Sequence, residues 1–138
     1  AGTLRLLRWF AQKVSQTSKK YAESANSLLK INTSGDNVLL PPSVVIVLLR
    51  ICQESINNAV KHAKSKNITI DINIEKPNFS IEISDDGVGF NINNSKRGYG
   101  LNNMRERMQE ILGTFEILSE IGKGTKIILT GELKEKYD

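Results

Sequence analysis

A predicted helix over about residues 43–63 carries a polar face whose side chains could bind a metal ion and phosphates. At about 100° per residue, this face is formed by Glu54, Asn57, Asn58 and Lys61. Because Glu54 and Asn58 are four residues apart, a carboxylate and an amide oxygen can address one ligand group. These oxygen ligands, beside the positive charge of Lys61, suit a magnesium-bound phosphate chain. An ordinary solvent-exposed helix face would have the same polar residues. His62, the only histidine, borders this face, so we expect a packed or phosphate-side role and not a metal cluster.

Two acids and two glycines follow a predicted strand in the stretch "SDDGVGF", residues 84–90. Asp85 and Asp86 would repel each other if both were buried, so at least one needs a donor, such as the exocyclic amine of a base. Gly87 and Gly89 allow another group to approach the backbone closely. Turn formation alone would also explain this pair of glycines.

A second glycine pair precedes a predicted helix. Gly98 and Gly100 lead into a helix that begins near Leu101, and such a start presents free N–H groups and a positive dipole end. This geometry suits an anion such as phosphate. A dinucleotide-binding Rossmann motif fits less well, because these glycines follow a polar loop and lack a third glycine at the required spacing.

The hydrophobic pattern predicts the elements that position these residues. Helical spacing predicts helices over about residues 3–23, 43–63 and 101–112, and alternation or apolar runs predict strands over 27–33, 68–74, 79–85, 115–120 and 124–133. We expect Ser43 to cap the second helix, Gly113 to be the C′ residue of the third, and "TSGDN", residues 33–37, to form a turn. The predicted fold is a two-layer α+β sandwich, with three helices on one face of a mixed, mostly antiparallel sheet.

Composition narrows the class of protein. A chain of 138 residues predicts one domain, 1–138, and no stretch approaches the roughly 18 apolar residues of a membrane span. The lone Cys52 excludes an internal disulfide, so we expect a cytoplasmic setting. The net charge of +4 comes from scattered lysines, which indicates a solvated surface and no nucleic-acid partner. Because the chain begins Ala1-Gly2 without a signal-peptide pattern, we expect a piece of a longer protein.

Four ordered segments resemble the motifs of a known family. "ESINNAVKHA", "DDGVGF", "RGYGLNNMRERM" and "GKGTKI" are similar to the N, G1, G2 and GT boxes of the ATP-binding superfamily of gyrase, mismatch-repair ATPases, a heat-shock chaperone and sensor histidine kinases. The "KHA" ending, a short lid at residues 91–100 and "GLNNMRERM" most resemble the histidine-kinase branch that includes nitrate and membrane-fluidity sensors. "LRLLRWFAQ" resembles the lead-in to this domain, with residues 1–23 as its helix.

The resemblance implies a role for each motif residue. Asp85 would accept a hydrogen bond from the adenine amino group, with Thr125 helping through water. Gly87 and Gly89 would pass close to the nucleotide, and Gly98, Gly100 and Leu101 would frame the lid end nearest the phosphates. Asn58 would be the protein's Mg²⁺ ligand, with Lys61 and His62 near the phosphates. Glu54 occupies the acidic position used as a base or orienting group for the accepting imidazole. Asp86 stands where many relatives carry Asn, a change expected only to adjust local charge.

The implied function is the supply of the γ-phosphoryl group of Mg-ATP for histidine autophosphorylation in a two-component sensor kinase. The acceptor histidine must lie outside this chain, because His62 is inside the N box. The expected partners are therefore a dimerisation and phosphoacceptor domain of the same parent and a response regulator. The domain itself should be a monomer without direct membrane contact, within a homodimeric parent that is an inner-membrane sensor.

Two other functions fit the same motifs. One is a serine-directed kinase that resembles anti-sigma factors, which uses this fold without a dimerisation domain. The other is a non-catalytic module in which nucleotide binding only shifts conformation. A histidine-bearing helix in the upstream sequence would favour the sensor kinase over the serine kinase, and a phosphotransfer assay would separate both from the module.

Overall fold

The computed structural model describes residues 6–36, 41–92 and 100–132. Its helices are α1 (Leu6–Val14), the π-helical turn η1 (Ser15–Lys19), α2 (Lys20–Ser24), α3 (Pro42–Lys61) and α4 (Leu101–Glu110). Its strands are β1 (Leu28–Gly35), β2 (Asn67–Glu75), β3 (Asn78–Asp85), β4 (Thr114–Ser119) and β5 (Thr125–Glu132). Because α1, η1 and α2 are consecutive, they form one helical segment, which corresponds to the first predicted helix.

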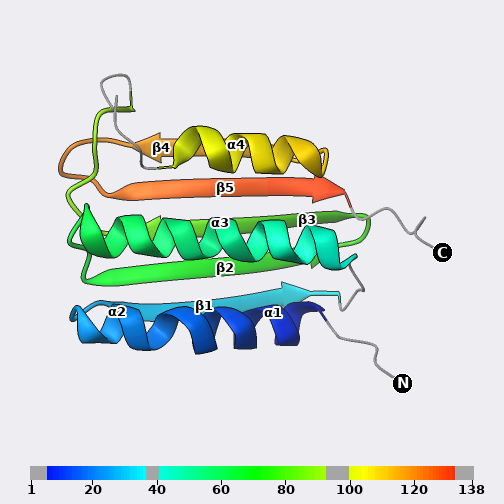
Figure 1. The fold of residues 1–138 in the computed structure, drawn as a ribbon, viewed down its shortest axis with the longest axis horizontal. Coiled ribbons are helices and arrows are strands. Elements are labelled where there is room, and N and C mark those ends of the chain that lie inside the picture. The colour runs from blue at the N-terminus through cyan, green and yellow to red at the C-terminus, as the bar shows by residue number, and fades with distance from the viewer. Residues whose placement is uncertain (1–5, 37–40, 93–99, 133–138) are drawn as a thin grey trace.

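The strands form one five-stranded sheet in the order β1-β2-β3-β5-β4 (Figure 1). β1 runs parallel to β2, and each of the other neighbouring pairs is antiparallel. A parallel pair needs a crossover connection, and α3 provides it between β1 and β2. The predicted α+β class with a mixed, mostly antiparallel sheet is confirmed.

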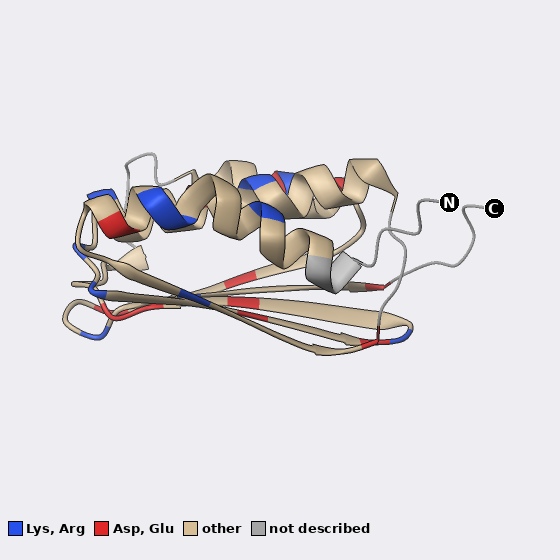
Figure 2. Ribbon diagram, turned by 90° about the horizontal axis from the view of Figure 1, so that it is seen from below, with Lys and Arg blue, Asp and Glu red and all other residues tan. Residues whose placement is uncertain are grey.

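The helices all lie on one face of the sheet, so the molecule has two layers (Figure 2). The alternation of strands β2 and β3 explains this arrangement, because every second side chain is buried toward the helices. Those buried side chains are Ile68, Ile70, Ile72 and Ile74 of β2 and Phe79, Ile81 and Ile83 of β3. The opposite face of the sheet carries polar residues such as Thr69, Asp71 and Glu82.

Helix α3 is the central helix of this layer. By length and composition alone, this helix is long and apolar enough to cross a membrane. This finding corrects the expectation that no stretch of the chain approaches the apolar length of a membrane span. Its apolar side is used in the core instead, because Leu48, Ile51, Cys52 and Ile56 are each no more than 1% exposed. Burial raises the pKa of the Cys52 thiol to about 12, so this cysteine is a protonated packing group.

Strand β1 extends two residues beyond its predicted end and corrects the expected turn at residues 33–37. Thr33, Ser34 and Gly35 pair with residues 72–74 of β2, and the Ser34 hydroxyl donates to Asn73 Oδ1 at 3.0 Å. Gly35 has a φ of +97°, a conformation that suits glycine at the end of the ladder. The polar composition that indicated a turn therefore belongs to an edge strand.

Two predicted helix ends are also corrected. Helix α3 begins at Pro42, with Pro41 as its N-cap residue and no side-chain cap, so Ser43 lies inside the first turn. At the end of α4, Leu112 and not Gly113 is the left-handed C′ residue, with a φ of +60°. The Gly113 N–H donates to Met108 O at 2.8 Å and the Leu112 N–H to Gln109 O at 3.0 Å, which is a Schellman motif.

Replacing Leu112 with glycine should raise the free energy of unfolding by about 0.5–1 kcal/mol, because glycine adopts this φ without steric cost. The leucine side chain is 76% exposed and loses little contact. Urea unfolding followed by circular dichroism measures the change. Leu118→Gly is the matched control, since this leucine is 54% exposed but lies in regular strand β4, and it should lower stability. Equal losses in both variants would contradict the interpretation of this helix end.

Candidate functional site

Six of the predicted site residues line one narrow cavity between α3 and the sheet. They are Asn58 and His62 of α3, Asp85 and Gly89 at and beyond the end of β3, Leu101 of α4 and Thr125 of β5. The cavity is narrow, with a volume of about 30 Å³, which is room for about one or two water molecules. Its lining combines apolar side chains, such as Ile83 and Ile127, with a few convergent polar groups, which is typical of ligand sites.

Asp85 is the half-buried acid at one wall of this cavity. Its Oδ1 accepts hydrogen bonds from the Ser65 hydroxyl at 2.9 Å and from the Gly87 N–H at 2.8 Å. Desolvation by burial raises the pKa of Asp85 above 3.8, although the donors Gly87 and Ser65 act in the opposite direction. A partly desolvated acceptor with fixed orientation is suited to recognise a hydrogen-bond donor on a ligand.

Asp86 points to the other side of the chain and has a structural role. Its Oδ1 accepts the backbone N–H groups of Lys66 and Asn67 at 2.8 and 2.9 Å, and its Oδ2 accepts the Asn67 side-chain amide at 2.8 Å. These hydrogen bonds lower the pKa of Asp86, with those from Asn67 contributing most. The Asp86 side chain therefore holds the start of β2, a structural role that the motif resemblance does not predict.

The glycines after β3 are required by contacts of the chain with itself. A Cβ at Gly87 would lie 2.5 Å from both the Ala63 Cβ and the Ser65 hydroxyl oxygen. A Cβ at Gly89, whose φ is +66°, would collide with the backbone oxygen of Glu120. The loop can therefore pack against the α3–β2 connection and the β4–β5 turn only because these residues lack side chains.

Thr125 reaches the cavity from the first position of β5 and lies directly opposite Asp85 in the sheet. Its hydroxyl is hydrogen-bonded to the Ser119 hydroxyl at 2.7 Å, and Ser119 also accepts the Phe90 N–H at 3.0 Å. Ser119 thus connects the loop after β3 to the wall that Thr125 forms.

Glu54 lies outside this cavity, in a neighbouring groove of about 290 Å³ between α3 and α4. Its carboxylate sits against Gly100, where a Cβ would be 2.8 Å from Glu54 Oε1. Gly100 is the N-cap residue of α4 and has a φ of +70°, so the Glu54 carboxylate lies near the positive end of that helix. The groove also contains Asn57, so the polar face of α3 divides between two adjacent sites.

The remaining predicted residues have other positions. Lys61 is exposed at the last turn of α3. Among the described residues, neither Lys61 nor Gly87 lines the narrow cavity or the groove that contains Glu54. Gly98 and residues 93–99 of the predicted lid lie outside the described residues.

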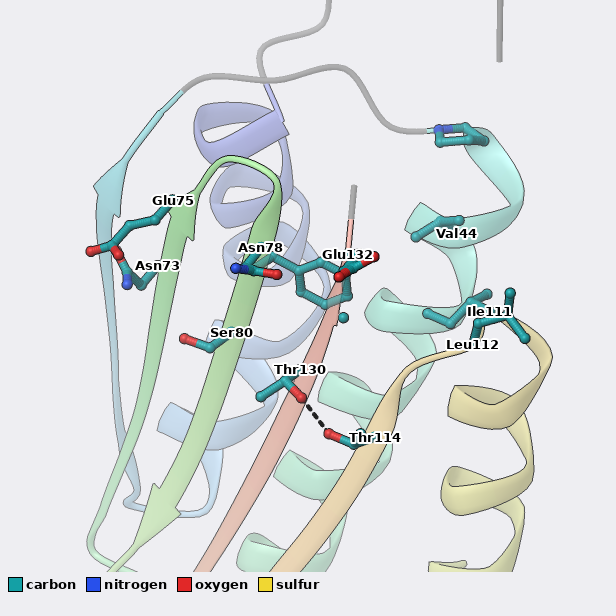
Figure 3. Close-up of a pocket in the computed structure, with 13 residues that line it drawn as sticks. Val44, Asn73, Glu75, Asn78, Ser80, Ile111, Leu112, Thr114, Thr130 and Glu132 are labelled. Atoms are coloured by element: carbon teal, nitrogen blue, oxygen red, sulfur yellow. Dashed lines mark hydrogen bonds between the residues drawn. The ribbon is translucent and has the colours of Figure 1, made fainter. Parts of the chain in front are cut away.

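A larger cavity, of about 600 Å³, lies away from these motifs (Figure 3). It is open at the end of the sheet where α3 begins and α4 ends, with Val44, Ile111 and Leu112 on one side and Glu132 and Asn78 on the other. None of the predicted site residues lines it. Chemistry and not volume therefore identifies the smaller cavity as the candidate site.

Residues 44–135 match the family model of the histidine kinase-, DNA gyrase B- and HSP90-like ATPases. The chain belongs to this family. The family is one of ATPases, so membership implies that the domain binds ATP, and the resemblance found in the four motifs is confirmed.

Sequence relatives agree with this assignment. The chain is 34% identical over 124 residues to the signal transduction histidine-protein kinase/phosphatase DegS of Bacillus subtilis, covering 82% of this chain and 32% of DegS. It is 40% identical over 81 residues to the sensor histidine kinase LiaS of the same organism, covering 58% of this chain and 22% of LiaS. The chain thus spans about a third or less of these relatives.

Solved structures show the same fold. The histidine kinase domain of the blue-light activated histidine kinase of Erythrobacter litoralis EL346 superposes with a TM-score of 0.74 at 18% identity, covering 94% of this chain and 66% of that chain. The Acinetobacter baumannii histidine kinase AdeS gives 0.75 at 14% identity, covering 93% and 65%.

Sequence reasoning did not find Ser65 and Ser119. Ser65 lies between α3 and β2, and Ser119 is the last residue of β4. Neither belongs to a motif or to a periodic pattern of polar residues. Only the strand register and the path of the α3–β2 connection bring them to Asp85 and Thr125. No sequence signal marks them.

The substitution Asp85→Asn should maintain or raise stability at pH 7 while it weakens ADP binding. Because the pKa of Asp85 is higher in the folded than in the unfolded protein, ionisation of this side chain lowers the free energy of unfolding. The contribution of Asp85 to stability is therefore most favourable below its unfolded-state pKa and is lost as the pH rises through its folded-state pKa. The stability advantage of the asparagine variant should therefore be largest at pH 7 and shrink on acidification. Urea unfolding at several pH values and calorimetric titration with ADP measure both effects. A variant that is less stable at pH 7 but binds ADP normally would contradict this account.

Proposed function

We propose that this chain is the ATP-binding, catalytic domain of a sensor histidine kinase. In this role it supplies the γ-phosphoryl group of Mg-ATP to a histidine on a separate domain of the same parent protein. The observation that carries the proposal is the convergence of Asp85, Asn58 and Thr125, from three different motifs, on one cavity. The sequence relatives DegS and LiaS are histidine kinases, which supports this choice among the functions of the family.

Base recognition falls to Asp85 in this proposal. Its carboxylate accepts a hydrogen bond from the adenine amino group, and Thr125, opposite it in the sheet, completes the contact through water. Gly87 and Gly89 keep the loop after β3 close to the base. The cavity of about 30 Å³ must widen before a purine can enter, so binding is coupled to movement of its walls.

The phosphates lie toward α3 and the start of α4. Asn58 would hold Mg²⁺, and its place in the cavity lining fits that role. Among the described residues, no group of three or more His, Cys, Asp or Glu side chains is placed to hold a metal ion. Bound Mg²⁺ would neutralise phosphate charge. Lys61 and His62, at the end of α3, would complement the phosphates, while the N–H groups after Gly100 and Leu101 would face them.

Glu54 is the group that assists the acceptor histidine. It lies in the groove next to the nucleotide cavity, one turn before Asn58 on α3, so it can reach an imidazole that approaches the γ-phosphate. Transfer then depends mainly on positioning and charge neutralisation. The proposed partners are a dimerisation and phosphoacceptor domain of a homodimeric parent and a response regulator. We place this domain in the cytoplasm and the parent in the inner membrane.

The substitution Glu54→Gln should lower phosphoryl transfer by about 10²-fold or more, because general-base assistance is lost, and should change ADP affinity little. The measurement uses the parent protein with labelled ATP for transfer and calorimetry for affinity. Glu110→Gln, at the exposed end of α4, is the matched control and should leave both unchanged. Normal transfer by the Glu54 variant would contradict the assigned role, and ATP binding without any transfer by the wild-type parent would indicate a nucleotide-sensing module.

A further inference from the structure

Two buried serines connect the acid of the nucleotide cavity to the beginning of the sheet. The Ser65 hydroxyl donates to Asp85 Oδ1 at 2.9 Å, and the Ser65 carbonyl oxygen accepts the Ser27 hydroxyl at 2.5 Å. Both serines are only 3% exposed. Neither belongs to the four motifs, and the proposed function gives neither a role.

The position of the Ser65 hydroxyl is fixed on several sides. Its backbone N–H donates to Ala59 O at 3.0 Å, so the residue is tied to α3 as well as to Ser27. The space beside the hydroxyl is closed, because a Cβ at Gly87 would lie 2.5 Å from Ser65 Oγ. Ser65 thus offers one donor in one place, and Asp85 Oδ1 receives it.

Asp85 Oδ1 is occupied twice, by the Ser65 hydroxyl and by the Gly87 N–H at 2.8 Å. Two donors on one oxygen fix the plane of the carboxylate. Both also lower the pKa of Asp85 against the effect of burial, and so favour the ionised form that accepts hydrogen bonds.

We propose that Ser65 is a positioning residue that sets the choice of base: by holding Oδ1, it directs Oδ2 of Asp85 to the amino group of adenine. This inference rests on the proposed function. A purine with a carbonyl in place of that amino group would bring an acceptor against the fixed carboxylate, which leaves buried polar groups unpaired. Loss of Ser65 frees the carboxylate to turn, so it reduces discrimination between the bases more than it reduces binding of purines in general.

Ser27 extends this role to the junction between α2 and β1. Its hydroxyl holds the Ser65 carbonyl, and the neighbouring Leu28 N–H donates to Lys66 O at 2.8 Å. The junction between α2 and β1 therefore contacts the connection that orients Asp85. Ser27→Ala should change base selection in the same direction as Ser65→Ala, but less, because it acts through the Ser65 backbone.

The test compares the affinities of this chain for Mg-ADP and Mg-IDP, in which a carbonyl replaces the amino group, by calorimetric titration. In Ser65→Ala the preference for ADP over IDP should fall about tenfold, the equivalent of one lost hydrogen bond to a charged group. Ser18→Ala removes a serine that is 4% exposed in the N-terminal helical segment and should keep the wild-type preference. Urea unfolding checks that each variant is folded. If Ser65→Ala does not fold, Ser65→Cys, which keeps a weaker donor, should show the same loss to a smaller extent.

The outcomes separate this inference from the proposed function. If Ser65→Ala lowers the affinities for ADP and IDP by the same factor, or changes neither, Ser65 does not select the base and the inference is wrong. Asp85→Asn, measured in parallel, should lose the preference for ADP. If that variant keeps the wild-type preference, the adenine assignment of Asp85 is itself overturned, and the role of Ser65 with it.

Discussion

A half-buried carboxylate at the end of β3 is the constraint on which the site depends. An ionised acid out of water is stable only where donors compensate it, and Asp85 receives them from Ser65 on the α3–β2 connection and from Gly87 in its own loop. Its neighbour Asp86 is turned to solvent and holds the start of β2. Two adjacent acids therefore have different environments: Asp85 lines the cavity, and Asp86 is bound to the backbone.

The cavity is built from the ends of elements whose positions are set by the core. Helix α3 buries Ile51 and Ile56 against the sheet, so Asn58 and His62 are carried to the cavity by packing that occurs one or two turns away. The loops meet closely enough only where side chains are missing: a Cβ at Gly124 would collide with the carbonyl of Asp85, as one at Gly89 would with Glu120. The glycines of the motifs thus support the site by letting the protein pack on itself, before any ligand is considered.

Much of this architecture can be predicted from the sequence, because periodicity reports which face of an element is buried. The alternation of residues 68–74 and 79–85 predicts β2 and β3, and the polar face of α3 predicts Asn58 in the site. The ends of helices and strands, and contacts between residues far apart in the sequence, cannot be predicted in this way. Leu112 takes a left-handed conformation that composition assigns to Gly113, and residues 33–35 pair with β2 although they look like a turn. Ser65 reaches Asp85 across 20 residues of sequence, a contact that depends on strand register and has no local signature.

A crystal structure of this chain grown with Mg-ADP tests the account most directly, because two cavities at opposite ends of the sheet compete as binding sites. The account predicts that the base lies in the small cavity, widened, with its amino group within hydrogen-bond distance of Asp85 and the Ser65 hydroxyl still on Oδ1. The metal should then lie beside Asn58. A nucleotide bound instead in the large cavity beside Val44 and Ile111, or a base that leaves Asp85 without contact, would contradict it.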